Sequence, residues 1–175
     1  MSLTNPANVR SQSTTDTWIT PKWIIDRFGP FDLDPCAADT MPWSTAKTMM
    51  TKRENGLLYD WRMSPRVWLN PPYGRELGTW LERMRFCNGL ALVFARTDTQ
   101  AFHEHVWPHA KAILFLRKRI VFCSEDGIPA ATNAGCPSVL IAYGSAGSFR
   151  LWQRSRMADS NNEDLSIGKL CFINP

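Results

Sequence analysis

The residues with the clearest chemical use are Asn70, Pro71, Pro72 and Tyr73, which directly follow the expected strand 66–69. The exocyclic amine of adenine is a poor nucleophile, because its lone pair is delocalised into the ring. The side-chain oxygen of Asn70 and the carbonyl of Pro71 can both accept its N–H hydrogens, so that the lone pair is directed at an electrophilic methyl group. The Tyr73 ring can stack on a base removed from its helix. The pattern therefore indicates methyl transfer to a planar amine.

A second polar cluster, Asp32-Leu33-Asp34-Pro35, follows the apolar residue Phe31. Ligands of an open parallel sheet bind at the carboxyl ends of its strands, where both clusters are expected to lie. Asp-Pro is also a common turn former, so for this cluster alone a simple turn stays an equal alternative.

The composition limits the kind of protein that can carry these clusters. The 175 residues suit one domain with a real core, and no apolar run approaches the roughly 20 residues of a membrane helix. The polar start of the sequence does not resemble a signal peptide, so we expect a soluble, cytoplasmic protein. The five cysteines form no CxxC pair, which favours reduced thiols. A formal net charge of +4 permits a phosphate-bearing partner without requiring one.

Strands and helices alternate in the first two thirds of the chain, and strands follow strands afterwards. This order predicts an α/β domain with a mostly parallel sheet and an antiparallel edge formed by the last strands. Residues 1–16 are expected to be a flexible arm and residues 17–175 a single domain. The expected helices are 22–28, opened by Thr20 as cap and Pro21, 76–87 and 99–110. The expected strands are 31–34, 66–69, 90–95, 112–116, 119–122, 138–143 and 149–152.

The sequence resembles the small phage Dam-like DNA N6-adenine methyltransferases, which depend on S-adenosylmethionine. The resemblance runs from about Thr17 to Tyr143. It rests on the segments TWITPKWI, FDLDPCA, the Asn-Gly-Leu…Trp stretch at 55–61, WLNPPYG, LVFARTDT, FLRKRIVF and PSVLIAY. It implies a Rossmann-like methyltransferase fold and double-stranded DNA with a flipped adenine as substrate. No metal is implied, and the oligomeric state stays open.

The same resemblance implies roles for individual residues. Asn70, Pro71, Pro72 and Tyr73 match its catalytic element. The implied cofactor contacts are Trp18, Thr20, Pro21, Asp34, Pro35 and Cys36, although Cys36-Ala37-Ala38 stands where many methyltransferases have a glycine-rich loop. For the cofactor ribose Glu54, Asp60 and Asp39 compete, and Asp60 is slightly favoured. Arg119 matches an arginine of the family's pattern and is the implied DNA contact, and Arg96 on the same rim is expected to contact DNA or cofactor. The basic cluster 117–119, with Lys118, is either a clamp for DNA phosphates or a solvated turn.

Other interpretations fit the sequence less well. Pro35-Cys36 could belong to a cytosine-C5 methyltransferase, but the partner segments of that chemistry are missing. A metal site at His103, His105 and His109 is disfavoured, because Pro108 disrupts the helix that would align them. An NPPY element also serves RNA adenine and protein glutamine methyltransferases, and an inactive DNA-binding homologue stays possible. The loop 123–137 is the expected DNA-reading segment, but it contains no arginine. This is compatible with low sequence specificity and equally with specificity gained through a dimer.

Overall fold

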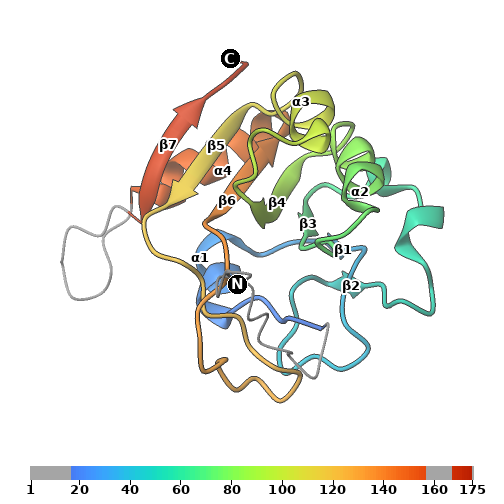
Figure 1. Ribbon diagram of the computed structural model, residues 1–175. Coiled ribbons are helices and arrows are strands. Elements are labelled where there is room, and N and C mark those ends of the chain that lie inside the picture. Colours follow the sequence, from blue (N-terminus) through green and yellow to red (C-terminus); the bar gives the residue numbers. More distant parts are fainter. Residues whose placement is uncertain (1–16, 157–166, 175) are drawn as a thin grey trace, which may run out of the picture.

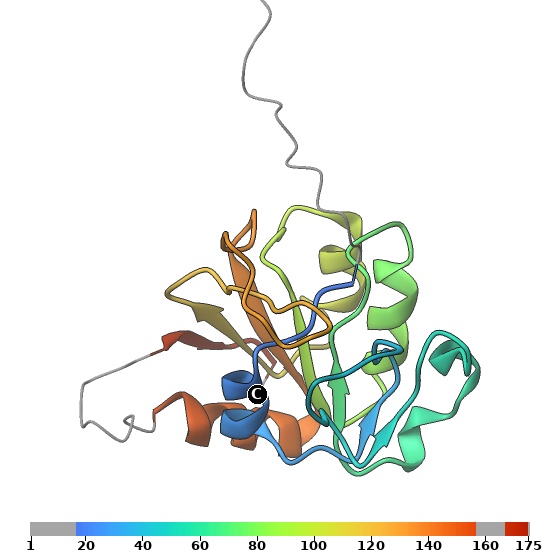
Figure 2. The ribbon, with the colours of Figure 1, turned by 90° about the horizontal axis from the view of Figure 1, so that it is seen from below.

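The computed structural model describes residues 17–156 and 167–174. The predicted arm at residues 1–16 lies outside the described residues. Within them, one seven-stranded sheet carries helices on both faces (Figures 1 and 2). No helix of this described part is long and apolar enough to cross a membrane.

The sheet has the strand order β2-β1-β3-β4-β6-β5-β7. Strands β2, β1, β3 and β4 pair in parallel, whereas β4 with β6, β6 with β5 and β5 with β7 pair antiparallel. The strands are β1 (Leu33–Asp34), β2 (Thr48–Met49), β3 (Val67–Leu69), β4 (Gly89–Phe94), β5 (Ala112–Leu116), β6 (Ser138–Tyr143) and β7 (Gly168–Phe172).

The α/β class is confirmed, and the sheet is more mixed than predicted. An antiparallel strand, β6, lies inside the sheet between β4 and β5 rather than at its edge. It can lie there because β6 is apolar along almost its whole length and is buried at all six positions.

The buried apolar residues form two clusters, one on each face of the sheet, and each cluster packs against two helices. Val67 and Leu69 of β3 pack on the side of α2 (Leu77–Met84) and α3 (Gln100–His105). Trp68 points to the opposite side, toward α1 (Lys22–Phe28) and α4 (Gly144–Ser155). Successive residues of a strand face opposite sides, so one short strand contributes to both cores. Figure 2 shows the sheet between these two pairs of helices.

Several predicted elements differ from the structure. No strand forms at 119–122, because this segment belongs to a loop whose bridges, Ile19 with Cys123 and Cys123 with Pro129, are isolated. Residues 149–152 lie inside α4 and not in a strand. Helix α3 ends at His105, five residues before the predicted end. Thr20 does not cap α1, since Pro21 is the N-cap and no side chain bonds there.

Helix α4 packs through small residues. Its buried residues are Gly147, Leu151 and Ser155, four apart on one face. A Cβ atom at Gly147 would lie 2.6 Å from the Gly89 carbonyl oxygen, so only glycine allows this close approach of helix and strand. The helix therefore covers residues 149–152, where the sequence predicted a strand.

Candidate active site

A cavity of about 680 Å³ lies at the carboxyl ends of β1 and β3. The two strands are parallel neighbours, so the residues that follow them emerge at the same edge of the sheet. Asp34, Pro35 and Cys36 line the cavity from β1, and Asn70–Tyr73 line it from β3. Trp18 and Thr20 line it from the segment before α1. Nine of the predicted catalytic and cofactor-binding residues are therefore brought together.

The amide of Asn70 is held from both ends. Its Nδ2 donates to the Trp18 carbonyl at 3.2 Å, and its Oδ1 accepts from the Tyr73 hydroxyl at 3.1 Å. A carbonyl oxygen has two lone pairs, so Oδ1 keeps one for a further donor. The amide thus presents an acceptor of fixed orientation to the cavity.

Tyr73 is fixed by its ring as well as by its hydroxyl. The ring stacks on Phe94, with centroids 4.1 Å apart and planes inclined by 21°. The hydroxyl also lies 3.3 Å from the Leu92 carbonyl. Burial raises the pKa of Tyr73, so the hydroxyl keeps its proton and acts as a donor. Two strands, β3 and β4, therefore hold this side chain.

The segment 17–20 reaches the cavity because other loops hold it. Ile19 and Cys123 exchange two backbone hydrogen bonds of 2.9 Å, and Trp43 Nε1 donates to the Thr20 carbonyl at 3.2 Å. These contacts place the Trp18 carbonyl beside Asn70. Pro21, a predicted cofactor contact, begins α1 and is not among the residues that line the cavity.

Asp34 is a buried carboxylate on the cavity wall, with 3% of its surface exposed. Its Oδ1 accepts from the Cys36 backbone N–H at 3.0 Å, and its Oδ2 accepts from the Thr45 hydroxyl at 2.5 Å. Burial raises the pKa of Asp34 to about 6, and the hydrogen bonds from Thr45 and Cys36 oppose that rise. No cation among the described residues forms a salt bridge with Asp34.

Asp32 of the same motif has a different environment. Its carboxylate pairs with Lys47 at 2.9 Å and with Arg66 at 3.4 Å. The hydrogen bond from Lys47 lowers the pKa of Asp32, against the opposing effect of burial, with help from Arg66. Asp32 therefore already has its partners, whereas Asp34 can still receive a cationic ligand.

Cys36 lines the cavity but is not a nucleophile at neutral pH. Burial raises the pKa of its thiol to about 12, and the negative charges of Asp34 and Glu76 add to that rise. The cytosine-C5 interpretation needs a thiolate at this position. The environment of Cys36 argues against that interpretation.

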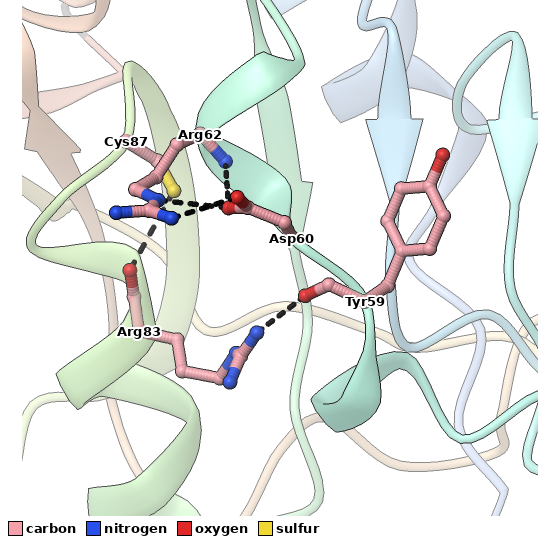
Figure 3. A network of polar contacts seen from close by, with 5 residues as sticks. All are labelled: Tyr59, Asp60, Arg62, Arg83 and Cys87. Atoms are coloured by element: carbon pink, nitrogen blue, oxygen red, sulfur yellow. Dashed lines mark hydrogen bonds and ion pairs between the residues drawn. The ribbon is translucent and has the colours of Figure 1, made fainter.

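Asp60 lies outside the lining of the cavity. It accepts from the Arg62 backbone N–H at 3.1 Å at the start of the 3₁₀ helix η2 (Trp61–Met63), and it pairs with the Arg62 guanidinium at 2.8 Å (Figure 3). The hydrogen bonds from Arg62 lower the pKa of Asp60 to about 2. Of its competitors for the ribose, Asp39 lines the cavity, whereas Glu54 does not and instead accepts from Thr51.

The predicted DNA contacts lie outside the cavity, after β4 and β5. Arg96 donates to the Cys136 sulfur at 3.8 Å, and Arg119 donates to the Gly135 carbonyl at 3.1 Å. Both guanidinium groups therefore contact residues 135–136, the end of the predicted DNA-reading loop. Lys118 between β5 and this loop is exposed. Glu125 of the loop also lines the cavity, so the loop borders its mouth.

Sequence reasoning missed two positions at this site, Thr45 and Gly56. Thr45 bonds Asp34 across eleven residues of a connection with no periodic pattern, so no local signal marks it. A Cβ atom at Gly56 would lie 1.9 Å from the Pro35 carbonyl oxygen. Its position inside the Asn-Gly-Leu…Trp stretch was the signal that could have marked it. Within the described residues no group of three His, Cys, Asp or Glu side chains could hold a metal ion.

Comparison with known proteins identifies relatives of the chain. A family model described as "DNA N-6-adenine-methyltransferase (Dam)" matches residues 8–165. A protein of Escherichia phage T1 named "DNA N-6-adenine-methyltransferase" is 26% identical over 108 residues, which cover 58% of this chain and 44% of that protein. The match thus spans less than half of the phage relative. No solved structure gives a significant match.

Proposed function

The chain belongs to the DNA N-6-adenine-methyltransferase (Dam) family, and we propose that it transfers a methyl group from S-adenosylmethionine to the N6 amine of a flipped adenine in double-stranded DNA. The observation that carries the proposal is the fixed amide of Asn70 on the wall of a cavity that also holds a buried carboxylate without a cationic partner among the described residues. The amide oxygen of Asn70 can accept from an amine, the carboxylate of Asp34 can bind a cation, and both residues line the same cavity.

The residues of the cavity fit S-adenosylmethionine as cofactor. A volume of about 680 Å³ lies within the range of roughly 300–1,000 Å³ that small-molecule sites occupy. Asp34 offers a negative charge in a desolvated place, which suits a positively charged ligand. Nε1 of Trp68 and of Trp80, two lining residues, has no hydrogen-bond partner among the described residues. When bound, the cofactor supplies the electrophilic methyl group on its sulfonium.

The chain's own residues act on the adenine amine. The free lone pair of Asn70 Oδ1 accepts one N6–H, and the Pro71 carbonyl accepts the other. Both hydrogen bonds strengthen as positive charge develops on the nitrogen, so they stabilise the transition state more than the ground state. The S–CH₃ bond breaks as the N–CH₃ bond forms, the neutral thioether S-adenosylhomocysteine is the leaving group, and the surplus N6 proton passes to water. The Tyr73 ring, held in place by Phe94 and by the edge contact with Phe122, is the proposed stacking surface for the flipped base.

The remaining rate enhancement comes from positioning the N6 amine in line with the methyl group. Correct alignment of a nucleophile with its electrophile is worth effective molarities of roughly 10⁵–10⁸ M. No covalent enzyme intermediate is required, which agrees with the protonated thiol of Cys36. Arg96, Lys118 and Arg119 contribute contacts to the DNA phosphates, and the loop 123–137 lies against the duplex near the cavity.

A labelling experiment tests the proposed acceptor. The full chain is incubated with S-adenosylmethionine labelled in its methyl group and, separately, with double-stranded DNA, RNA and a protein mixture. We expect label in DNA, and digestion to nucleosides should release N6-methyldeoxyadenosine. Label in RNA or in protein glutamine would replace the proposal with one of the other uses of this site. Cofactor binding without transfer to any of the three acceptors would favour an inactive DNA-binding homologue.

A further inference from the structure

Thr45 is the residue that holds the buried carboxylate of Asp34. Both side chains are 3% exposed, and Thr45 Oγ1 donates to Asp34 Oδ2 at 2.5 Å. The other carboxylate oxygen already accepts from the Cys36 backbone N–H. Without the Thr45 hydroxyl, Oδ2 would have no donor among the interactions of the described residues. A buried carboxylate that lacks a donor strongly favours its protonated form.

The backbone fixes Thr45 in this position. Strand β2 pairs in parallel with β1, and Met50 N donates to the Asp34 carbonyl at 2.8 Å. Thr45 N in turn donates to the Met49 sulfur at 3.4 Å. The connection that carries Thr45 is therefore fastened to the strand that carries Asp34, and the short hydrogen bond is part of this arrangement.

We propose that Thr45 is a positioning residue that keeps Asp34 ionised and oriented for the positively charged cofactor. The inference rests on the proposed function, since it assumes that S-adenosylmethionine binds in this cavity. Thr45 acts through Asp34 and not by contact with the reacting atoms. Its hydroxyl sets the pH below which the cofactor is lost.

Other charges near Asp34 do not replace this effect. The thiol of Cys36 has a pKa raised to about 12, so it does not titrate between pH 5 and 9. Thr45 and Cys36 are the groups that lower the pKa of Asp34 against the rise caused by burial. The other titratable side chains that line the cavity are Asp39, Lys52, Tyr73, Glu76 and Glu125, and burial raises the pKa of Tyr73 further above this pH range.

Calorimetric titration of the full chain with S-adenosylmethionine between pH 5.5 and 8.5 tests the proposal. In the wild-type protein, affinity should fall as pH drops through about 6, where Asp34 takes up a proton. In Thr45→Val the midpoint should move up by about one pH unit, which weakens binding about fivefold at pH 6 and leaves it almost unchanged at pH 8.5. Thr45→Ser keeps the hydroxyl and should restore the wild-type midpoint.

Two further variants make the result specific. Thr45→Cys keeps a weak donor of similar size and should shift the midpoint by a smaller amount, which tests the proposal even if Thr45→Val does not fold. Thr99→Val removes a hydroxyl that donates to the Arg96 carbonyl outside the lining of the cavity, and its midpoint should equal that of the wild type.

The outcomes separate the two hypotheses. An affinity that Thr45→Val lowers by the same factor at every pH, or does not change, would overturn the role of Thr45 while the proposed function stands. A wild-type protein that binds no S-adenosylmethionine at any pH would overturn the proposed function, and the inference with it.

Discussion

The parallel half of the sheet and its antiparallel half differ in the length of their strands and in the loops that follow those strands. Strands β2, β1 and β3 have two or three residues, and the polar loops after β1 and β3 line the cavity. Strands β5, β6 and β7 have five or six residues and join β4 in long antiparallel ladders. The structure therefore separates two tasks. The antiparallel half supplies continuous apolar packing, and the parallel half supplies strand ends that carry chemistry (Figure 1).

The largest effect should come from Asn70→Ala in the parallel half. The variant loses the acceptor for the N6 amine, and kcat should fall about 10²–10³-fold, the range for removing one preorganised polar group from an active site. Cofactor affinity, measured by calorimetry, should stay within about threefold of wild type. Asn174→Ala is the matched control, because Asn174 also donates its amide to backbone carbonyls but lies next to β7. Full turnover in Asn70→Ala would refute the catalytic role of the NPPY element.

Leu140→Ala tests the antiparallel half. Leu140 is fully buried in β6 and pairs with Leu92 and Leu114 across the ladder. Truncation should lower the free energy of unfolding by about 2–5 kcal/mol, measured by urea denaturation, because it leaves a cavity in the core. Leu58→Ala, at an exposed position of the parallel half, should have little effect on stability. A loss of cofactor affinity in folded Leu140→Ala protein would show that the two halves are not separable.

Asp34→Asn should change both cofactor binding and the stability of the fold. The pKa of Asp34 is raised in the folded protein to about 6, so the folded chain binds this proton more tightly than the unfolded chain between about pH 4 and 6. Ionisation of Asp34 therefore lowers the free energy of unfolding as pH rises through this window, by about 3 kcal/mol once Asp34 is fully ionised. We expect Asp34→Asn to lose cofactor binding and, without cofactor, to lose less stability than wild type between pH 5 and pH 8, by roughly 1 kcal/mol.

Denaturation of both proteins at the two pH values measures that difference. Equal pH dependence in wild type and Asp34→Asn would show that Asp34 is not the titrating group. Retained cofactor binding would remove Asp34 from the site and leave the cavity without its negative partner.

The same contrast explains which features the sequence could predict. Asp34 and Asn70 were expected at one edge because Asp34 ends one strand, Asn70 follows another, and parallel strands end on the same side. The uninterrupted apolar runs of β4, β5 and β6 were also recognisable as buried strands. Local patterns were sufficient wherever burial on both faces leaves a continuous signal.

The remaining elements depend on contacts that no local pattern records. Helix α4 begins Gly-Ser-Ala-Gly-Ser and packs a small-residue face, so it lacks the wide apolar stripe of an amphipathic helix. Strand β7 was not predicted, because none of its residues is fully buried. Thr45 meets Asp34 only once β2 has paired with β1. In each case the tertiary partner, and not the segment itself, decides the structure.

Asp60→Asn should have the smallest effect, because this carboxylate belongs to the surface and not to the cavity. Asp60 is exposed and pairs with Arg62, and its pKa is lowered to about 2. It therefore stays ionised in the folded protein from pH 4 to 9 and adds no pH dependence to cofactor binding in that range. Asparagine keeps the acceptor at the start of η2, and exposed ion pairs contribute little. Cofactor affinity should stay within about twofold of wild type, whereas Asp39→Asn alters a lining residue and should weaken it more. The reverse order would move the ribose contact to Asp60 and would extend the site beyond the cavity, toward the network that Figure 3 shows around Arg62 and Arg83.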